Sequence, residues 1–428
     1  MPVENSRIPG FYKMSIEERL QKVKELVGLS EEEAELLRKW GGLDPRIADT
    51  MIENVIGSMP YPFAVATNFR INGRDYLVPM VIEESSVVAA ASNAARFMRE
   101  GDGIRSFATE PLMISQIHLV GVDEPYEKGF RVLERKKEVL ELANSVDKVL
   151  VQLGGGARDL EMRVIPTERG KVLTFHLIVD VRDAMGANAV NSMAERVAPL
   201  LEEITGGRAV LRIISNLADR RLVRSSVVVS KEALGGEEVV ELIAETSAIA
   251  AADPYRAATH NKGIMNGVIA VALATGQDHR ALEAGAHAYA ARNGFYTTLT
   301  RWYKTREGLL AGTLEMPMAV GIIGGATKVH PLARVALKIL GVKTAKELAE
   351  VMGAVGLAQN FAALRALATE GIQRGHMKLH AKNLAIMAGA SPEEAAKIAE
   401  ALAKQGPVTF DRAKELLEKL RRGEPLGA

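Results

Sequence analysis

Hydrophobic positions in the first third of the chain recur with the spacing of helices, and polar residues mark where those helices begin. Ser15 and Ser30 each precede a glutamate by three residues, which is the capping-box pattern of a helix start. A third helix is predicted over residues 47–56. Residues 61–81 then form two extended runs around Asn72-Gly73, a dipeptide that favours a type I′ hairpin turn.

The middle third combines strand-like alternation with helical stripes. Its apolar positions predict the order β-α-β-β-α-β, which is the split, ferredoxin-like arrangement. The predicted elements are strand 112–122, helix 130–144, strand 159–165, strand 171–181, a helix that buries residues from Val190 to Ile204, and strand 210–215. We expect this unit, at about residues 110–220, to be inserted into a mostly helical domain.

The last third is rich in alanine and is predicted to be helical. Ser391 begins a capping box with proline at the first helical position, and a small helical unit follows to the end of the chain. The predicted fold class is therefore α+β: a mostly helical large domain, an inserted ferredoxin-like (split β-α-β) domain and a small helical C-terminal unit.

Composition narrows the classes of function. The 428 residues are 47% hydrophobic and 25% charged, which is typical of a soluble globular protein. A net charge of +1 gives no electrostatic reason to expect a polyanion or an anionic membrane as partner. The absence of cysteine excludes disulfides, a thiolate nucleophile and sulfur-ligated metals. The apolar runs 267–276 and 248–252 are shorter than the roughly 20 residues of a membrane helix, and the N-terminus opens with charged residues, so we expect a cytoplasmic protein.

Neither common nucleotide-binding glycine motif is present, and polar residues gather instead in two segments rich in glycine and alanine. Residues 183–188 follow a predicted strand and open a helix, where backbone N–H groups can bind a phosphate; spacing alone favours Asp183 as a simple helix cap. Residues 253–267 contain Arg256, a fork for a carboxylate, and Lys262, a point charge for a developing oxyanion. An ordinary solvated loop explains the second segment equally well.

Other titratable residues have structural alternatives too. Asp278 precedes a predicted helix and is placed to cap it. Glu83 and Glu84 end an apolar strand, where repulsion between neighbouring carboxylates raises one pKa, although an exposed strand end is the commoner outcome. His376 and His380 have i, i+4 spacing, but no glutamate lies between them and no third ligand is evident. We therefore expect no metal site, and a single working His376 at most.

Taken together, these segments resemble hydroxymethylglutaryl-CoA reductase, specifically the soluble class II enzymes, which lack the membrane anchor of class I. The resemblance runs through nearly the whole chain, in family order. The matching segments are Met51–Gly57, Asn72–Ser86, Asp183–Asn188, Asp253–Gly267, Gly312–Pro317, Gly321–Thr327 and Glu370–Met377. So many ordered matches favour the chemical interpretation of these residues over the structural one.

The resemblance implies a reaction and the residues that catalyse it. Such enzymes interconvert 3-hydroxy-3-methylglutaryl-CoA with mevalonate plus CoA by two successive hydride transfers, toward isoprenoid precursors or in mevalonate degradation. Lys262 would stabilise the oxyanion, and Asp278 would hold Lys262 in place. Glu84 would protonate the reduced carbonyl, and His376 would protonate the departing CoA thiolate from a mobile flap. The implied substrate-binding residues are Arg256, Ser86, Asn266 and Gln359.

The resemblance also implies where the nicotinamide cofactor binds. Asp183, Met185, Gly186, Ala187 and Asn188 would lie at the diphosphate, with Asn216 as a polar support. Asp147 matches the position whose carboxylate accepts the adenosine ribose hydroxyls. Because a carboxylate there repels a 2′-phosphate, we predict NAD(H) over NADP(H), with Lys148 beside it as an opposing charge.

Domains and assembly follow from the same resemblance. Residues 1–110 and 221–370 would form a large domain for substrate and CoA, residues 111–220 a small NAD-binding domain, and residues 371–428 a C-terminal flap. The active site would lie at the interface of a homodimer or of a larger assembly of dimers.

Two other classes of function are less well supported. A non-redox acyl-CoA enzyme needs no nicotinamide site, so residues 183–188 argue against it. Nucleic-acid binding by the split sheet lacks stacking platforms, since Phe175 is the single aromatic residue of its predicted strands, and it lacks a positive net charge. We expect no nucleic-acid partner and no membrane partner.

Overall fold

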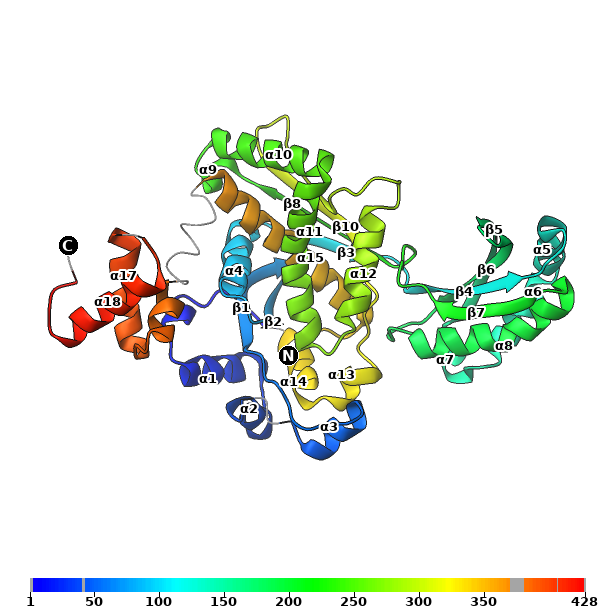
Figure 1. Cartoon of the computed structure of the whole chain (residues 1–428), viewed down its shortest axis with the longest axis horizontal. Helices are drawn as coiled ribbons and strands as arrows, with labels where there is room; N and C mark the ends of the chain where they lie inside the picture. Colours follow the sequence, from blue (N-terminus) through cyan, green and yellow to red (C-terminus); the bar gives the residue numbers. More distant parts are fainter. Residues whose placement is uncertain (1–2, 41–42, 370–380, 406, 427–428) are drawn as a thin grey trace.

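The computed structural model describes residues 3–40, 43–369, 381–405 and 407–426. A large central body carries a smaller lobe on one side and the C-terminal helices on the other (Figure 1). The structure combines helices with three sheets, and the predicted α+β class is confirmed.

The N-terminal elements begin where their capping signals predict. Both capping boxes form, at the start of α1 (Ile16–Val27) and of α2 (Glu31–Arg38). Helix α3 (Pro45–Met51) begins earlier than the predicted helix 47–56, because Asp44 caps it and Pro45 is its first residue, and it is shorter because it ends at Met51. The hairpin of β1 (Phe63–Ile71) and β2 (Arg74–Val81) turns at Asn72 and Gly73, both with positive φ, as predicted.

The small lobe has the predicted β-α-β-β-α-β order. Its antiparallel sheet has the strand order β5-β6-β4-β7, and its helices pack on one face around a separate hydrophobic core. The predicted helix 130–144 is instead two helices that meet at Arg135. The elements are β4 (Leu112–Val120), α5 (Pro125–Glu134), α6 (Lys136–Asn144), α7 (Lys148–Gln152), β5 (Gly156–Thr167), β6 (Gly170–Asp180), α8 (Ala187–Thr205) and β7 (Arg208–Ile214).

The central body contains a four-stranded antiparallel sheet that the sequence analysis did not predict. Its order is β3-β8-β10-β9, so the expectation that the last third is helical was wrong for residues 300–317. The elements are the 3-10 helix Phe11–Lys13, α4 (Val87–Met98), β3 (Arg105–Ala108), β8 (Leu222–Val229), α9 (Lys231–Leu234), α10 (Glu237–Ala252), α11 (Pro254–Ala274), α12 (His279–Ala290), β9 (Thr300–Lys304), β10 (Leu310–Pro317), α13 (Gly325–Val329), α14 (Pro331–Leu340) and α15 (Ala345–Ala368).

Helix α15 forms the centre of this body. It packs against α11, α4 and β3, and glycines allow the close approach; a Cβ on Gly267 of α11 would lie 3.0 Å from the Cβ of Gln359. Among the described helices it alone has the length and hydropathy of a membrane span, but 67% of its most apolar window is buried inside the protein. That burial is what a core helix shows.

The C-terminal helices form a small core of their own. The capping box at Ser391 is present, because its backbone N–H donates to Glu394 and its hydroxyl accepts from the Glu394 N–H. Helix α17 (Pro392–Gln405) packs against α18 (Phe410–Arg421) through alanine and leucine side chains. These helices lie beyond one end of the central body in Figure 1.

Candidate active site

The β1–β2 hairpin and helix α11 bring two oppositely charged side chains together. Glu84 lies just beyond β2, and Lys262 lies in α11, which packs against β2. Nζ of Lys262 donates to Oε2 of Glu84 at 2.7 Å, although the two residues are 178 positions apart. The side chains are 59% and 37% exposed, so an incoming molecule can reach both. The ammonium of such a pair can stabilise a developing oxyanion, and the carboxyl group can exchange a proton with that oxygen.

Buried polar residues immediately before Lys262 fix the rotation of α11. Asn261 is fully buried, and its Nδ2 donates to the carbonyl of Thr297 at 2.9 Å. The Nε2 atom of His260 lies 2.5 Å from the hydroxyl of Thr300. Successive helical residues are rotated by about 100°, so Lys262 is turned away from this buried face.

Burial shifts the pKa values of two basic groups in α11. Desolvation, with a smaller contribution from the positive charge of Arg256, lowers the pKa of His260 to about 3. His260 is therefore neutral in the folded protein and serves the fold. Burial is the single cause that lowers the pKa of the half-buried Arg256. A partly desolvated guanidinium of this kind is suited to bind a carboxylate ligand.

Two of the predicted substrate-binding residues have buried polar atoms without a partner in the described part of the chain. These atoms are Oγ of Ser86, which precedes α4 with φ 75°, and Oε1 of Gln359 in α15. Gln359 packs against Gly267, and Asn266 lies one turn after Lys262 on the same face of α11. Buried polar atoms are normally hydrogen-bonded, so these two call for a polar ligand or a water.

Asp278 occupies the structural role that its spacing favoured. It caps α12, where its Oδ1 accepts from the N–H of Ala281 at 3.1 Å, and it pairs with Arg280 at 3.0 Å. Lys262 pairs with Glu84, and no contact between Asp278 and Lys262 is found among the described residues. His376 and His380 lie outside the described residues, so the predicted role of His376 stays a prediction.

Residues 183–188 form the turn between β6 and α8. Gly186 is the N-cap of α8 at φ 97°, and a Cβ there would lie 2.4 Å from the side chain of Val181. Asp183 does not cap α8, contrary to the interpretation favoured by spacing; its Oδ1 accepts from the N–H of Ala345 at the start of α15, at 2.8 Å. No acceptor for the N–H groups of residues 186–189 is found within the described part of the chain. A turn with free N–H groups at a helix N-terminus fits the diphosphate of a dinucleotide.

The other predicted cofactor residues, Asp147 and Asn216, lie just before α7 and after β7. Asp147 caps the short helix α7, with Oδ1 accepting from the N–H of Leu150 at 2.8 Å. Asn216 is exposed on the segment that returns to the central body, and its carbonyl lies so close to Gly285 of α12 that a Cβ there would be 2.6 Å away. Among the described residues, no three histidine or acidic side chains gather as a metal site would require.

Sequence reasoning missed two buried polar residues around this turn. Gln277 clamps Gly321, accepting from its N–H and donating to its carbonyl, both at 2.9 Å. Arg221 donates to the carbonyls of Ala184 and Met185. No signal in the sequence distinguishes the buried Arg221 from the exposed Arg220, because two adjacent arginines are normally both solvent-exposed.

Comparison with known proteins identifies the family. A family model described as hydroxymethylglutaryl-coenzyme A reductase matches residues 15–381. The 3-hydroxy-3-methylglutaryl-coenzyme A reductase of Archaeoglobus fulgidus is 60% identical over 97% of this chain and 95% of its own, and a probable reductase of Borreliella burgdorferi is 37% identical over 87% and 86%. The solved reductase of Streptococcus pneumoniae aligns with a TM-score of 0.83 and 42% identity, over 96% of this chain and 99% of its own. Another structure of this class II enzyme, bound to NADPH, aligns with a TM-score of 0.81, over 95% of this chain and 100% of its own. The resemblance predicted from sequence motifs is thereby confirmed, and the chain belongs to the hydroxymethylglutaryl-coenzyme A reductase family.

Proposed function

We propose that this protein is a hydroxymethylglutaryl-CoA reductase of the mevalonate pathway, interconverting 3-hydroxy-3-methylglutaryl-CoA and mevalonate plus CoA. Family membership supports the reaction. The observation that carries the proposal is the pair of Lys262 and Glu84 at 2.7 Å, beside the unpartnered polar atoms of Ser86 and Gln359. An oxyanion-stabilising cation, a proton donor and unsatisfied binding groups are what reduction of a thioester needs.

The residues divide the chemistry between them. A bound nicotinamide supplies hydride, and two such transfers take the thioester to the alcohol. Lys262 stabilises the oxygen that gains charge at each reduction, and Glu84, in contact with Nζ, delivers the proton that this oxygen takes up. When the carbon–sulfur bond breaks, His376 protonates the CoA thiolate. Asp278, which caps α12, holds Lys262 in place and tunes the proton network that Lys262 shares with Glu84.

The acyl end of the substrate carries a carboxylate and a tertiary hydroxyl. Arg256, half-buried and with burial as the single cause of its pKa shift, binds the carboxylate together with Ser86. Gln359 and Asn266 supply amide groups from α15 and α11, which pack against each other. These four residues orient the acyl group so that its thioester carbonyl faces Lys262.

The cofactor preference is the finer part of the proposal. The free N–H groups at the start of α8 bind the diphosphate, and Met185 to Asn188 line it. Oδ1 of Asp147 accepts from the N–H of Leu150, and its second oxygen, which has no hydrogen-bond partner in the described part of the chain, accepts the ribose hydroxyls. That carboxylate disfavours a 2′-phosphate, so we propose NAD(H) as the preferred cofactor. The S. pneumoniae relative was solved with NADPH. Because relatives can bind the phosphorylated cofactor, measuring the preference of this protein tests the role proposed for Asp147.

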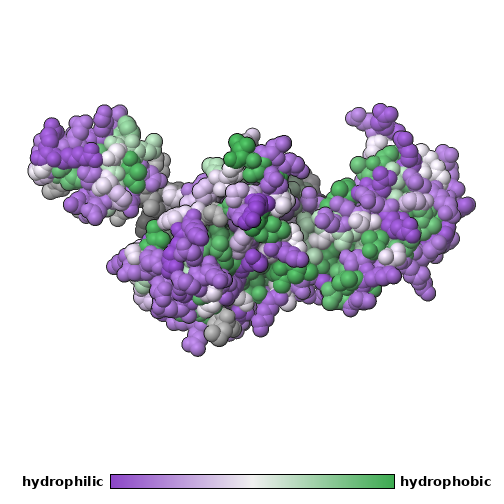
Figure 2. Space-filling view, turned by 90° about the horizontal axis from the view of Figure 1, so that it is seen from below, coloured by the Kyte–Doolittle hydropathy of each residue, from purple (hydrophilic) through white to green (hydrophobic). Residues whose placement is uncertain are grey.

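The division into domains and the assembly are also proposed. The separate hydrophobic cores support a large domain of residues 1–110 and 221–370, a small cofactor domain of residues 111–220 and a C-terminal flap of residues 371–428. Ile52, Ile56 and Met59 are 66%, 104% and 81% exposed, which supports a homodimer that covers this segment. Apolar side chains also reach the surface elsewhere on the central body (Figure 2). The proposed location is the cytoplasm.

A coupled assay tests this function directly. Purified protein is mixed with mevalonate, CoA and either NAD⁺ or NADP⁺, and reduced nicotinamide is followed by its near-ultraviolet absorbance. We expect a signal that requires CoA and is larger with NAD⁺. A signal that does not need CoA, or silence in this direction and in the reverse direction with 3-hydroxy-3-methylglutaryl-CoA, would contradict the proposal.

A further inference from the structure

Arg221 is a buried cation without a carboxylate hydrogen-bond partner among the described residues. It is 5% exposed, and its guanidinium donates to backbone carbonyls: Nη1 to Ala184 at 3.1 Å and to Met185 at 3.2 Å, and Nη2 to Val320. Burial lowers its pKa to about 10. Its hydrogen bonds go to neutral groups, although the charges of Asp180 and Asp183 oppose the fall in its pKa. A buried charge held in this way stabilises a fold less than a well-packed apolar side chain of the same size. General stability is therefore a poor explanation for this residue.

The three carbonyls belong to two different bodies of the molecule. Ala184 and Met185 lie in the turn 183–188 that opens α8, whereas Val320 lies in the central body. This turn is docked on the central body, since the N–H of Ile322 donates to the carbonyl of Asp183 at 2.9 Å. Arg221 thus ties the proposed diphosphate-binding turn to the segment of the central body between β10 and α13.

The hydrogen bonds also fix which way the peptide groups of the turn face. In a trans peptide the C=O and the following N–H point in opposite directions. Because the carbonyl of Met185 faces Arg221, the N–H of Gly186, the N-cap of α8, points away from the guanidinium. Rotation of this peptide would turn an acceptor oxygen toward the diphosphate and repel it.

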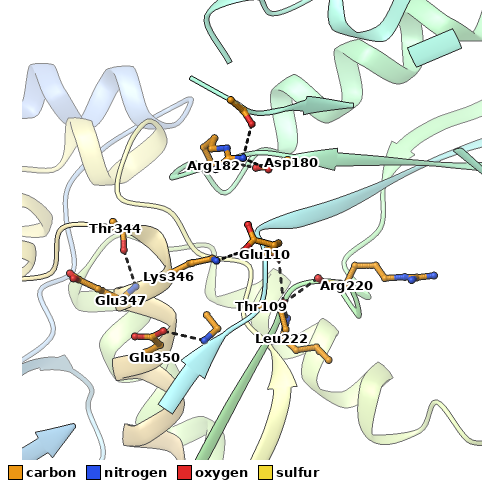
Figure 3. A network of polar contacts seen from close by, with 12 residues as sticks. Thr109, Glu110, Asp180, Arg182, Arg220, Leu222, Thr344, Lys346, Glu347 and Glu350 are labelled. Atoms are coloured by element: carbon orange, nitrogen blue, oxygen red, sulfur yellow. Dashed lines mark hydrogen bonds and ion pairs between the residues drawn. The ribbon is translucent and has the colours of Figure 1, made fainter. Parts of the chain in front are cut away.

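Other contacts hold the junction between the two bodies without Arg221. The hydroxyl of Thr109 accepts from the N–H of Leu222 at 2.9 Å and donates to the carbonyl of Arg220 at 3.3 Å. It therefore joins the two segments, before β4 and after β7, that connect the small lobe to the central body. Lys346 pairs with Glu110 across the same junction (Figure 3). Ile322 and Ala345 hold the turn at Asp183. The distinctive contribution of Arg221 is therefore to the peptide groups after Asp183, since its guanidinium binds the carbonyls of Ala184 and Met185.

We propose that Arg221 is a positioning residue for the nicotinamide dinucleotide: it holds the turn 183–188 with its N–H groups toward the diphosphate. The inference rests on the proposed function, because it concerns the cofactor site of that reaction. Its chemistry is specific to arginine, since one planar guanidinium reaches all three carbonyls and an ammonium of lysine cannot reproduce that fork. The effect is on cofactor binding, and the Glu84–Lys262 pair is left intact.

The test compares Arg221→Lys and Arg221→Met with a matched control, Arg220→Lys. Arg220 is the adjacent residue, half-exposed and paired with Glu161 at 2.9 Å, so the control changes the same side chain without touching the turn. Binding of NADH to the full chain is measured by its fluorescence, binding of CoA by calorimetry, and folding by thermal unfolding. Steady-state assays separate KM for the cofactor from kcat.

For Arg221→Lys we expect the Kd and KM for NADH to rise about tenfold, the value of one charge-assisted hydrogen bond, with kcat and CoA affinity nearly unchanged. Arg221→Met should bind NADH more weakly still, and Arg220→Lys should match the wild type. Unchanged NADH binding in both Arg221 variants would overturn the inference, as would equal losses of NADH and CoA binding together with a collapsed unfolding transition. Wild-type protein that binds neither NADH nor NADPH would overturn the proposed function, and this inference with it.

Discussion

Two cations of this chain, Lys262 and Arg221, are held in opposite ways. The ammonium of Lys262 is 59% exposed and has a carboxylate, Glu84, at 2.7 Å. The guanidinium of Arg221 is buried and has backbone carbonyls as its hydrogen-bond partners. Lys262 can change partner when a substrate arrives because water and Glu84 stabilise it meanwhile, whereas Arg221 cannot move without leaving buried carbonyls unpaired.

This difference separates a residue that takes part in the reaction, Lys262, from a residue that positions a binding turn, Arg221. A group that takes part in proton transfer must be accessible to the reacting atoms, so its removal is expected to cost rate and little stability. A group that fixes a backbone turn is expected to cost affinity for whatever the turn binds. The substitutions below test this division, beginning with the largest expected effect.

Lys262→Ala removes the cation of the exposed pair. We expect kcat to fall by about 10²–10³ or more, because the developing oxyanion loses its charged partner. Stability should change by only about 0.5 kcal/mol, as for other exposed sites. Lys304→Ala is a matched control, since Lys304 also forms an exposed ion pair, with Glu237 at 2.6 Å, outside the site. Steady-state rates and thermal unfolding of both variants decide the matter; a rate close to wild type for Lys262→Ala would remove it from the mechanism.

Glu84→Gln keeps the shape of the pair and removes its ability to deliver a proton. We expect a loss of about 10²–10³ in kcat, the usual scale for a general acid. The double variant with Lys262→Ala should be about as slow as the slower single variant, because the two residues act on one proton and their effects do not add. Fully multiplicative losses would show instead that Glu84 and Lys262 act at separate steps.

The contrast between buried and exposed groups extends to stability against pH. His260, two residues before Lys262, has its pKa lowered by burial to about 3, against about 6.5 in the unfolded chain. Between those values the unfolded state binds one more proton, so stability falls as pH is lowered through this window, by at most about 1.4 kcal/mol per pH unit. His260→Gln keeps a partner for Thr300 and should flatten this dependence. Denaturant unfolding from pH 6.5 to pH 4 checks it, with His279→Gln as a control; equal slopes in wild type and His260→Gln would exclude His260 as the source.

The site residues were named by the family resemblance, and their roles stay predictions. Lys262, Glu84, Ser86 and Gln359 were predicted as site residues, and the structure pairs the first two and leaves polar atoms of the others unpartnered. The partner of Asp183 was not predicted, because no motif in the sequence links it to the N–H of Ala345, which lies 162 positions away. The same holds for Arg221: its burial arises from how two bodies meet, and hydrophobic periodicity does not carry that information.

The two four-stranded sheets show the same limit on what the sequence predicts. In the small lobe, β5 has a stretch of alternating polar and apolar residues and β6 is a nearly continuous apolar run, so both strands could be predicted from the sequence. In the central body, β10 contains Gly312, packed on Trp302, and small residues that resemble the alanine-rich helices around it. Its pairing with β8, some 80 positions earlier in the register Leu310 with Val229, is set by tertiary contacts.

Asp147→Ala gives the smallest expected effect and sharpens the comparison from the side of the cofactor. Asp147 is a capping residue whose second oxygen is free to accept the ribose hydroxyls, so its removal should weaken NAD(H) and relieve the repulsion of a 2′-phosphate. We expect the ratio of kcat/KM for NAD(H) to that for NADP(H) to fall by about tenfold, which is one lost or gained charged contact. Asp147→Asn separates the two contributions, because it keeps the helix cap and removes only the charge. If both variants leave the ratio unchanged, selection against the 2′-phosphate does not depend on Asp147, and the preference must be sought at Lys148 or elsewhere in the small lobe.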